Sequence, residues 1–178
     1  MAGRFCGHSD PDVNAKGRMQ LTELAHLLSA EAIDEVYSSD LRRAKSTAQA
    51  IAQARNIPLS LRAALREIDF GQWEGLSWEQ IEERDPVYAR KWMAGYPHLP
   101  APSGESFGAF EERILQEVNQ LLDINRGPMA VVTHAGVLRV VLRHLCGCPD
   151  EAAWQQTRTY CSVVRYESRN LEAKGENE

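Results

Sequence analysis

The sequence predicts an α/β fold, a three-layer α/β/α sandwich around a mostly parallel central sheet. Helical and strand signals alternate along most of the chain, as in parallel sheets that are covered by helices. The stretch MAVVT at residues 129–133 shows no alternation of apolar and polar residues, which is typical of a strand buried on both faces. The length of 178 residues suits one domain with a sizeable core. We expect that domain over residues 1–168 and a charged, frayed tail over residues 169–178.

In the first half of the chain, apolar spacing and capping residues indicate where the elements begin. Leu21, Leu24, Leu27 and Leu28 fall on one face of a helix, and Asn14 is a suitable N-cap for it. The other expected elements are a strand at 33–38, an Ala-rich helix at 40–54 capped by Ser39 or Asp40, and an extended piece at 57–61.

The second half carries clearer helix starts. Ser77 and Gln80 form a capping box after a loop at 65–77. Apolar residues from Phe107 to Leu122 mark a long amphipathic helix that starts after Ser106 and ends near Gly127. The other expected elements are a short helix within 86–97, the strand at 129–133, a helix at 136–146 and a last strand at 161–167.

Composition excludes several classes of protein. The net charge is −5 and the basic clusters are short, so we expect no nucleic-acid partner. No apolar stretch approaches the roughly 20 residues that span a bilayer, and no signal peptide is evident, so we expect a cytoplasmic protein without a membrane partner. Cys146-Gly-Cys148 lacks a second pair of ligands, which favours free thiols over a metal site. We expect neither metal nor cofactor, and nothing indicates an oligomeric state.

Two junctions between a strand and a helix are candidates for ligand binding, because ligands of such folds sit at the carboxyl ends of strands. His134 follows the buried strand directly and precedes a helix N-terminus, which attracts anions. Arg42 and Arg43 lie in the first turn of another helix, where a cation opposes the helix dipole. This conflict indicates that one of the two faces an anionic ligand. Local hydrogen bonding of the His and a solvated Arg pair are the alternatives.

A third candidate is the acidic loop LREIDFGQWEG, which holds Glu67, Asp69 and Glu74. A carboxyl in this loop could act as a general acid if its pKa were raised. A solvated acidic loop is the alternative, and the stretch itself does not choose among the three acids.

The order and spacing of these motifs resemble those of the histidine phosphatase, or phosphoglycerate mutase-like, superfamily. The similarity runs from about Gly3 to Tyr166. It is carried by SSDLRRAKSTA, LREIDFGQWEG, PSGESF, VVTHAGVLR and, as the loop that follows the family's first catalytic motif, GRFCGHSDPDVNAKGRMQ.

The resemblance implies phosphoryl transfer through a phosphohistidine, without a metal, on a small phosphorylated metabolite. By motif, Arg43 rather than Arg42 matches the phosphate-binding Arg, Glu67 matches the proton donor, and His134 matches the second His. Cys6 and Gly7 fall where the family's first loop touches the substrate. These five residues are our predicted site.

The chain departs from the family in one respect, because it contains no Arg-His-Gly. That motif ends the family's first strand and carries the nucleophile. His8 matches a position downstream of it and is a poor substitute. The opening residues Met-Ala-Gly fit the interior of the family's loop, so we expect the first strand to be missing and the chain as written to be inactive or severely impaired.

Three functions therefore stay open from the sequence. The first is a phosphatase, favoured because the GHSD loop is similar to that of small α-ribazole-type phosphatases. The second is a phosphoglycerate mutase-type phosphotransferase. The third is a non-catalytic protein that binds phosphoesters or another protein.

Overall fold

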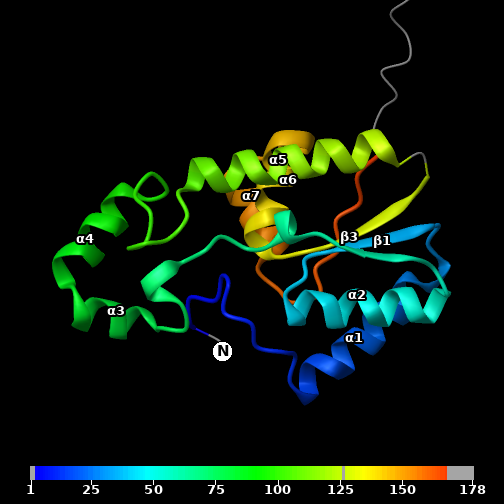
Figure 1. Cartoon of the computed structure of the whole chain (residues 1–178), viewed down its shortest axis with the longest axis horizontal. Coiled ribbons are helices and arrows are strands. Elements are labelled where there is room, and N and C mark those ends of the chain that lie inside the picture. Colours follow the sequence, from blue (N-terminus) through cyan, green and yellow to red (C-terminus); the bar gives the residue numbers. More distant parts are fainter. Residues whose placement is uncertain (1–2, 126, 168–178) are drawn as a thin grey trace, which may run out of the picture.

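The computed structural model describes residues 3–125 and 127–167, which form a small sheet between two layers of helices (Figure 1). The sheet has three parallel strands in the order β2-β1-β3. The predicted α/β class with a parallel sheet is confirmed.

The strands are β1 (Glu35–Ser38), β2 (Leu59–Leu61) and β3 (Met129–Val132). The α-helices are α1 (Ala15–Leu27), α2 (Arg42–Arg55), α3 (Trp78–Arg84), α4 (Pro86–Gly95), α5 (Phe107–Ile124), α6 (Ala135–Cys146) and α7 (Asp150–Thr157). The short 3₁₀ helices are η1 (Leu28–Ala30), η2 (Ala63–Leu65) and η3 (Gly71–Trp73).

Neighbouring residues of β1 show how the two helical layers are attached. Successive side chains of a strand point to opposite faces of the sheet. Val36 is fully buried and packs with Leu24 of α1 and Ile51 of α2. Tyr37 is also buried and packs with Leu121 of α5. One face of the sheet is therefore covered by α1 and α2 and the other by α5, which gives the three layers.

Local capping signals are reproduced at two helix starts, and the structure adds a cap at a third. The Asn14 side chain accepts a hydrogen bond from the Gly17 N–H at 2.8 Å. Ser77 and Gln80 form the reciprocal capping box of α3. Ser106 caps α5 in the same way. The Asn14 and Ser77 caps lie within four residues of the groups they bind, which is why the sequence alone could predict them.

The predicted cap of α2 is wrong. The N-cap is Leu41, which has no side-chain hydrogen bond to the helix. The Arg42 N–H instead donates to the Asp10 carboxylate at 2.6 Å. Ser39 is not the N-cap, and its hydroxyl lies 2.9 Å from the His134 ring. A carboxylate from a distant loop has thus taken the place of a local cap.

The predicted strand at 161–167 is also wrong, because residues 162–167 have no assigned secondary structure. A strand exists only where a neighbouring strand pairs with it. The sheet of the described residues has β2 and β3 at its edges, and no ladder joins this segment to either. Helix α5 ends at Ile124 rather than near Gly127. The predicted tail at 169–178 lies outside the described residues.

An aromatic cluster joins the N-terminal segment to α3 and α4, which lie to one side of the sheet (Figure 1). The ring of Phe5 lies 5.0 Å from that of Phe70 and 5.7 Å from that of Trp73, both in edge-to-face geometry. Its backbone N–H donates to Leu76 at 2.9 Å, and its carbonyl accepts from Gly75 at 2.7 Å. These contacts anchor the start of the loop that continues into the candidate site.

Candidate active site

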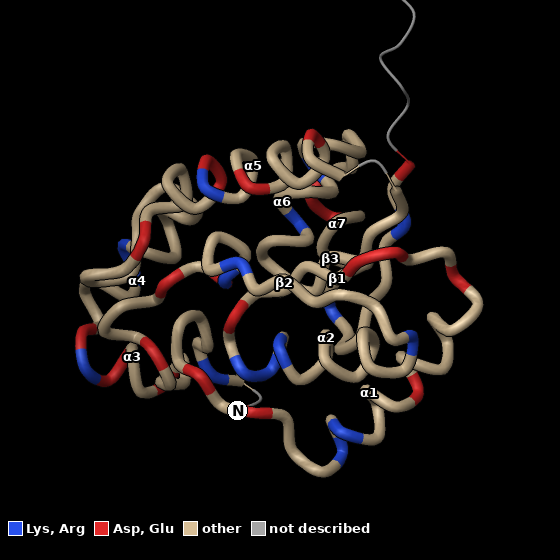
Figure 2. The backbone as a smooth tube through the Cα atoms, turned by 45° about the vertical axis from the view of Figure 1, so that its right-hand side comes forward, with Lys and Arg blue, Asp and Glu red and all other residues tan. Residues whose placement is uncertain are grey.

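The predicted site residues converge at the carboxyl ends of β1 and β3. Arg43 lies in the first turn of α2, which follows β1, and His134 is the N-cap of α6, which follows β3. Figure 2 shows basic residues at the beginning of α2. Glu67 comes from the loop after η2, and Cys6 and Gly7 come from the N-terminal loop. Four separate segments of the chain therefore contribute to one region.

Arg43 is the arginine that faces inward. Its Nη1 donates to the Ser9 carbonyl at 2.8 Å, and its Nη2 donates to the carbonyls of Gly7 at 2.7 Å and Cys6 at 3.3 Å. Arg42 is exposed, and its side chain pairs with the Asp12 carboxylate at 3.5 Å. The structure thus separates two neighbouring arginines that differ little in sequence, and it brings Cys6 and Gly7 into contact with Arg43 through their carbonyls.

His134 is buried, with 8% of its surface exposed, and its Nε2 lies 2.9 Å from the Ser39 hydroxyl. Burial lowers the pKa of His134 to about 3, and the positive charge of Arg43 acts in the same direction. The imidazole is therefore neutral at pH 7. A neutral imidazole offers one N–H donor and one acceptor, so His134 can bind an oxygen atom without carrying charge.

Glu67 is partly exposed as a residue, but its carboxyl group is surrounded by protein. Its Oε2 accepts a hydrogen bond from the Gly136 N–H at 2.9 Å, and its Oε1 accepts from the Ile68 N–H at 3.0 Å. Burial raises the pKa of Glu67, whereas the two N–H groups and the charges of Arg43 and Arg139 oppose this rise. A raised pKa is what a carboxyl needs to hold a proton and deliver it.

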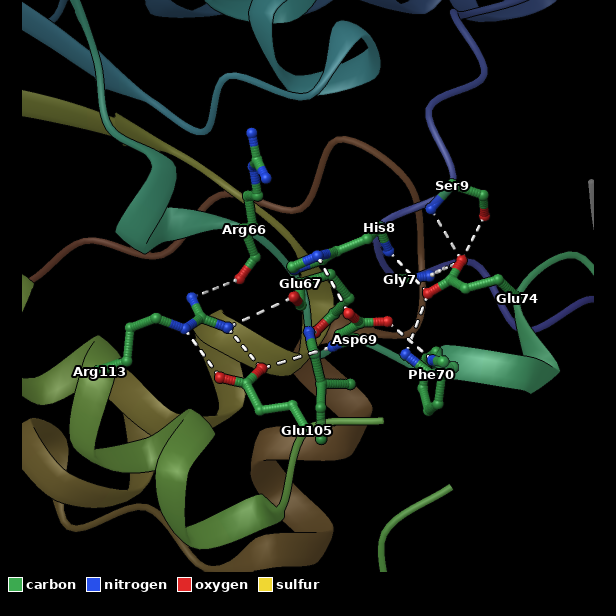
Figure 3. A network of polar contacts seen from close by, with 12 residues as sticks. Gly7, His8, Ser9, Arg66, Glu67, Asp69, Phe70, Glu74, Glu105 and Arg113 are labelled. Carbon is green, nitrogen blue, oxygen red and sulfur yellow. Dashed lines mark hydrogen bonds and ion pairs between the residues drawn. The ribbon is translucent and has the colours of Figure 1, made fainter. Parts of the chain in front are cut away.

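Glu74 has a different environment from Glu67, although both belong to the same loop (Figure 3). Its carboxylate accepts from the N–H groups of Gly7, His8 and Ser9 at 3.1, 2.7 and 2.8 Å, and from that of Phe70 at 3.0 Å. Partial burial opposes ionisation, yet these hydrogen bonds, led by those from Ser9, hold the pKa of Glu74 below its usual value. Glu74 thus fixes the N-terminal loop rather than holding a proton.

Close packing in this loop explains why residue 7 is a glycine. A Cβ atom at Gly7 would lie 1.9 Å from the Ile68 carbonyl oxygen and 2.5 Å from a carboxylate oxygen of Glu74. Only a residue without a side chain fits there. The carbonyl of Gly7 can therefore reach Arg43 while its N–H binds Glu74.

The third acid of the loop, Asp69, lies near His8. One Asp69 oxygen accepts from the Gly71 N–H at 2.7 Å, and the other is 3.5 Å from Nδ1 of His8. The His8 side chain extends from its loop toward Asp69 (Figure 3), and its buried Nε2 has no hydrogen-bond partner among the described residues. His8 therefore borders the site, next to Gly7 in the loop that the motifs already placed against the substrate.

Arg113 of α5 holds the loop that carries Glu67, and sequence reasoning missed it. Its Nη1 donates to the carbonyls of Ala64 at 2.7 Å and Arg66 at 3.1 Å. Its Nη2 lies 3.5 Å from the backbone carbonyl oxygen of Glu67. It also makes a two-point contact with the Glu105 carboxylate at 2.9 and 2.7 Å (Figure 3). Glu105 lies in the PSGESF motif, which was the one available signal for this contact.

Comparison with known protein families identifies the family of this chain. The sequence matches the family described as the histidine phosphatase superfamily, branch 1, over residues 1–176. The chain belongs to the histidine phosphatase superfamily. Its resemblance to this superfamily in sequence motifs is therefore confirmed. The roles of the individual site residues stay predictions.

Several histidine phosphatases are similar over most of the chain. The adenosylcobalamin/alpha-ribazole phosphatase of Escherichia coli K12 is 31% identical over 153 residues, which is 85% of this chain and 75% of that protein. Phosphoserine phosphatase 1 of Hydrogenobacter thermophilus is 32% identical over 175 residues, or 95% and 82% of the two chains. The structure of the alpha-ribazole phosphatase from Shigella flexneri matches with a TM-score of 0.77 at 28% identity, covering 86% of this chain and 76% of that one.

Two kinds of feature are absent from the described residues. No helix in residues 3–125 and 127–167 is long and apolar enough to cross a membrane. Over the same residues, no group of three His, Cys, Asp or Glu side chains is arranged to hold a metal ion.

Proposed function

We propose that this chain binds the phosphoryl group of a small phosphomonoester, in a site built for its hydrolysis. The observation that carries the proposal is the convergence of Arg43, His134 and Glu67 from three separate motifs. The similar proteins support the substrate class, because two of them are named phosphatases of alpha-ribazole and of phosphoserine. Phosphatase rather than mutase activity is proposed on this basis.

Each of the three side chains supplies one element of phosphoryl transfer. The Arg43 guanidinium has five N–H donors, and its three carbonyl contacts leave Nε–H and one Nη1–H for phosphate oxygens. Neutral His134 adds a further hydrogen-bond donor. Such fixed donors stabilise the charge that spreads over the phosphoryl oxygens in the transition state. Glu67 holds a proton and delivers it to the leaving oxygen.

The family's covalent route also needs a nucleophilic His, which its Arg-His-Gly motif supplies. This sequence contains no such motif. We therefore propose that the chain as written binds phosphoesters but hydrolyses them slowly. Removal of the nucleophile in a serine protease lowers kcat on the order of 10⁶-fold, and we expect a similar loss here.

Calorimetry of the full chain with sulfate tests the binding site. Sulfate resembles the phosphoryl dianion, and we expect Arg43→Ala to abolish its binding. Arg42→Ala is the matched control, because its exposed side chain pairs with Asp12 instead, and it should bind sulfate like the parent chain. Equal binding by the parent chain and Arg43→Ala would refute the assignment.

A turnover assay tests the proposed loss of activity separately. The full chain is mixed with 4-nitrophenyl phosphate, and acid-labile protein phosphate is measured alongside. We expect almost no turnover and no phosphohistidine. Ordinary enzymatic rates would contradict the proposed loss of the nucleophile while leaving the binding site intact.

A further inference from the structure

Arg139 of α6 lies on the side of the helix that carries Glu67. The N–H of Gly136, three residues earlier, donates to the Glu67 carboxylate at 2.9 Å. Residues three apart share one face of a helix, and a long side chain leans back toward the helix N-terminus. Arg139 therefore lies on the same side of α6 as the bound Glu67, and the two charges act on each other.

Helix α7 anchors this arginine without neutralising it. The guanidinium carbon lies 3.9 Å from the centre of the Trp154 ring, and Nε donates to the Thr157 hydroxyl at 2.8 Å. Within the described residues, its two terminal nitrogens have no hydrogen bond and no ion pair with a carboxylate. Stacking and the Nε contact fix the plane of the guanidinium. Its terminal nitrogens carry the N–H groups that can bind a carboxylate at two points.

The other arginines that lie near the site and could bind an anion are already paired with carboxylates of the chain. Arg66 pairs with Asp40, and Arg113 pairs with Glu105 at 2.7 Å. Arg143, one turn further along α6, pairs with Glu111 at 3.3 Å and with Asp150 at 2.9 Å. Arg139 thus differs from its neighbours in having a positive charge that these contacts do not balance.

The surroundings of Arg139 favour an anionic ligand. Burial lowers the pKa of Arg139, and the nearby Glu67 carboxylate and Tyr96 hydroxyl oppose this shift. The same charge acts on Glu67 in return. Glu67 acts on this charge without forming an ion pair with it within the described residues. A bound carboxylate in direct contact would lower the cost of partly burying the cation.

We propose that Arg139 binds a carboxylate on the leaving group of the substrate. The phosphoryl group would occupy Arg43, the bridging oxygen would face Glu67, and the carboxylate would reach Arg139. The substrate class is then an acidic phosphomonoester, in which a short carbon chain joins the phosphate to a carboxylate. This inference rests on the proposed function of the site.

Two small ligands allow the contribution of the carboxylate to binding to be measured. O-Phosphoserine and O-phosphoethanolamine both carry a phosphate and an ammonium group, and they differ only in the carboxylate. Calorimetry of the full chain should show that phosphoserine binds at least about tenfold more tightly, as expected for a charge-assisted hydrogen-bonded pair. Arg139→Met should remove this difference while leaving the affinity for phosphoethanolamine unchanged.

Controls separate binding from folding. Methionine keeps an apolar stem against Trp154, and thermal melts establish that Arg139→Met is folded. Arg139→Lys keeps the charge but cannot bind a carboxylate through two parallel hydrogen bonds, so it should retain only part of the preference for phosphoserine. Arg143→Met removes a neighbouring charge of the same helix that is already paired, and it should keep the full preference for phosphoserine.

The outcomes distinguish this inference from the proposed function. If the parent chain binds the two ligands equally, or if Arg139→Met and Arg139→Lys both keep the full preference, the role of Arg139 is wrong although the phosphoryl site stands. If neither ligand nor sulfate binds, the proposed function fails and the inference fails with it.

Discussion

Acidification should destabilise the protein because His134 is buried in its neutral form. The pKa of His134 is lowered to about 3 by burial, with Arg43 contributing, whereas an unfolded His titrates near pH 6.5. Below about pH 6.5 the unfolded chain therefore binds a proton that the folded chain does not. Each pH unit below that value costs about 1.36 kcal/mol, so lowering the pH from about 7.5 to about 5 should remove about 2 kcal/mol of stability.

Thermal melts at these two pH values measure the effect, which should lower Tm by about 4–8 °C for a chain of this size. His134→Gln cannot titrate, and its amide can still contact the Ser39 hydroxyl. Between the two pH values, the Tm of His134→Gln should fall less than that of the parent chain, by about 4–8 °C. The raised pKa of Glu67 acts in the opposite direction, because burial favours its protonated form, but it is present in both proteins and cancels in the comparison.

The exposed His26 supplies the control, and His26→Gln should show the same drop as the parent chain. The reasoning would be refuted if His134→Gln lost as much Tm between the two pH values as the parent chain does. That result would mean that His134 is either protonated in the folded state or accessible to water.

Three further changes test the packing around the site by urea unfolding. Glu74→Ala leaves four backbone N–H groups without their acceptor, so it should cost about 2–4 kcal/mol, whereas the exposed Glu79→Ala should cost less than about 0.5 kcal/mol. Arg113→Ala removes the cation that pairs with Glu105 and the donor of two carbonyls and should cost about 2–4 kcal/mol. Ile114→Ala opens a cavity at a fully buried position and should cost about 2–5 kcal/mol. A loss below about 1 kcal/mol in any of the three would contradict the packing described for it.

The parts of the fold that the sequence predicted correctly are those set by nearby residues. The N-caps Asn14 and Ser77 act on N–H groups three residues away. The amphipathic spacing of α5 and the apolar run of β3 are likewise local patterns. Such signals need no knowledge of how the chain returns on itself.

The parts that failed depend on distant partners. The N-terminus of α2 receives Asp10, which lies 32 residues before Arg42. The choice among Glu67, Asp69 and Glu74 depends on which carboxyl is enclosed by α6 and which meets the N-terminal loop. No spacing within LREIDFGQWEG contains that information, since burial is decided by the tertiary structure.

Both helix N-termini that the sequence marked as anion sites are occupied by carboxylates of the chain itself. Asp10 lies at α2, and Glu67 lies at α6. A bound phosphoryl group would therefore depend on the side chains of Arg43 and His134 rather than on helix N-termini. At α6 the arrangement has a chemical use in the proposed reaction. Burial keeps the proton on Glu67 before transfer, and the N–H groups of Gly136 and Ile68 stabilise the carboxylate that remains after it.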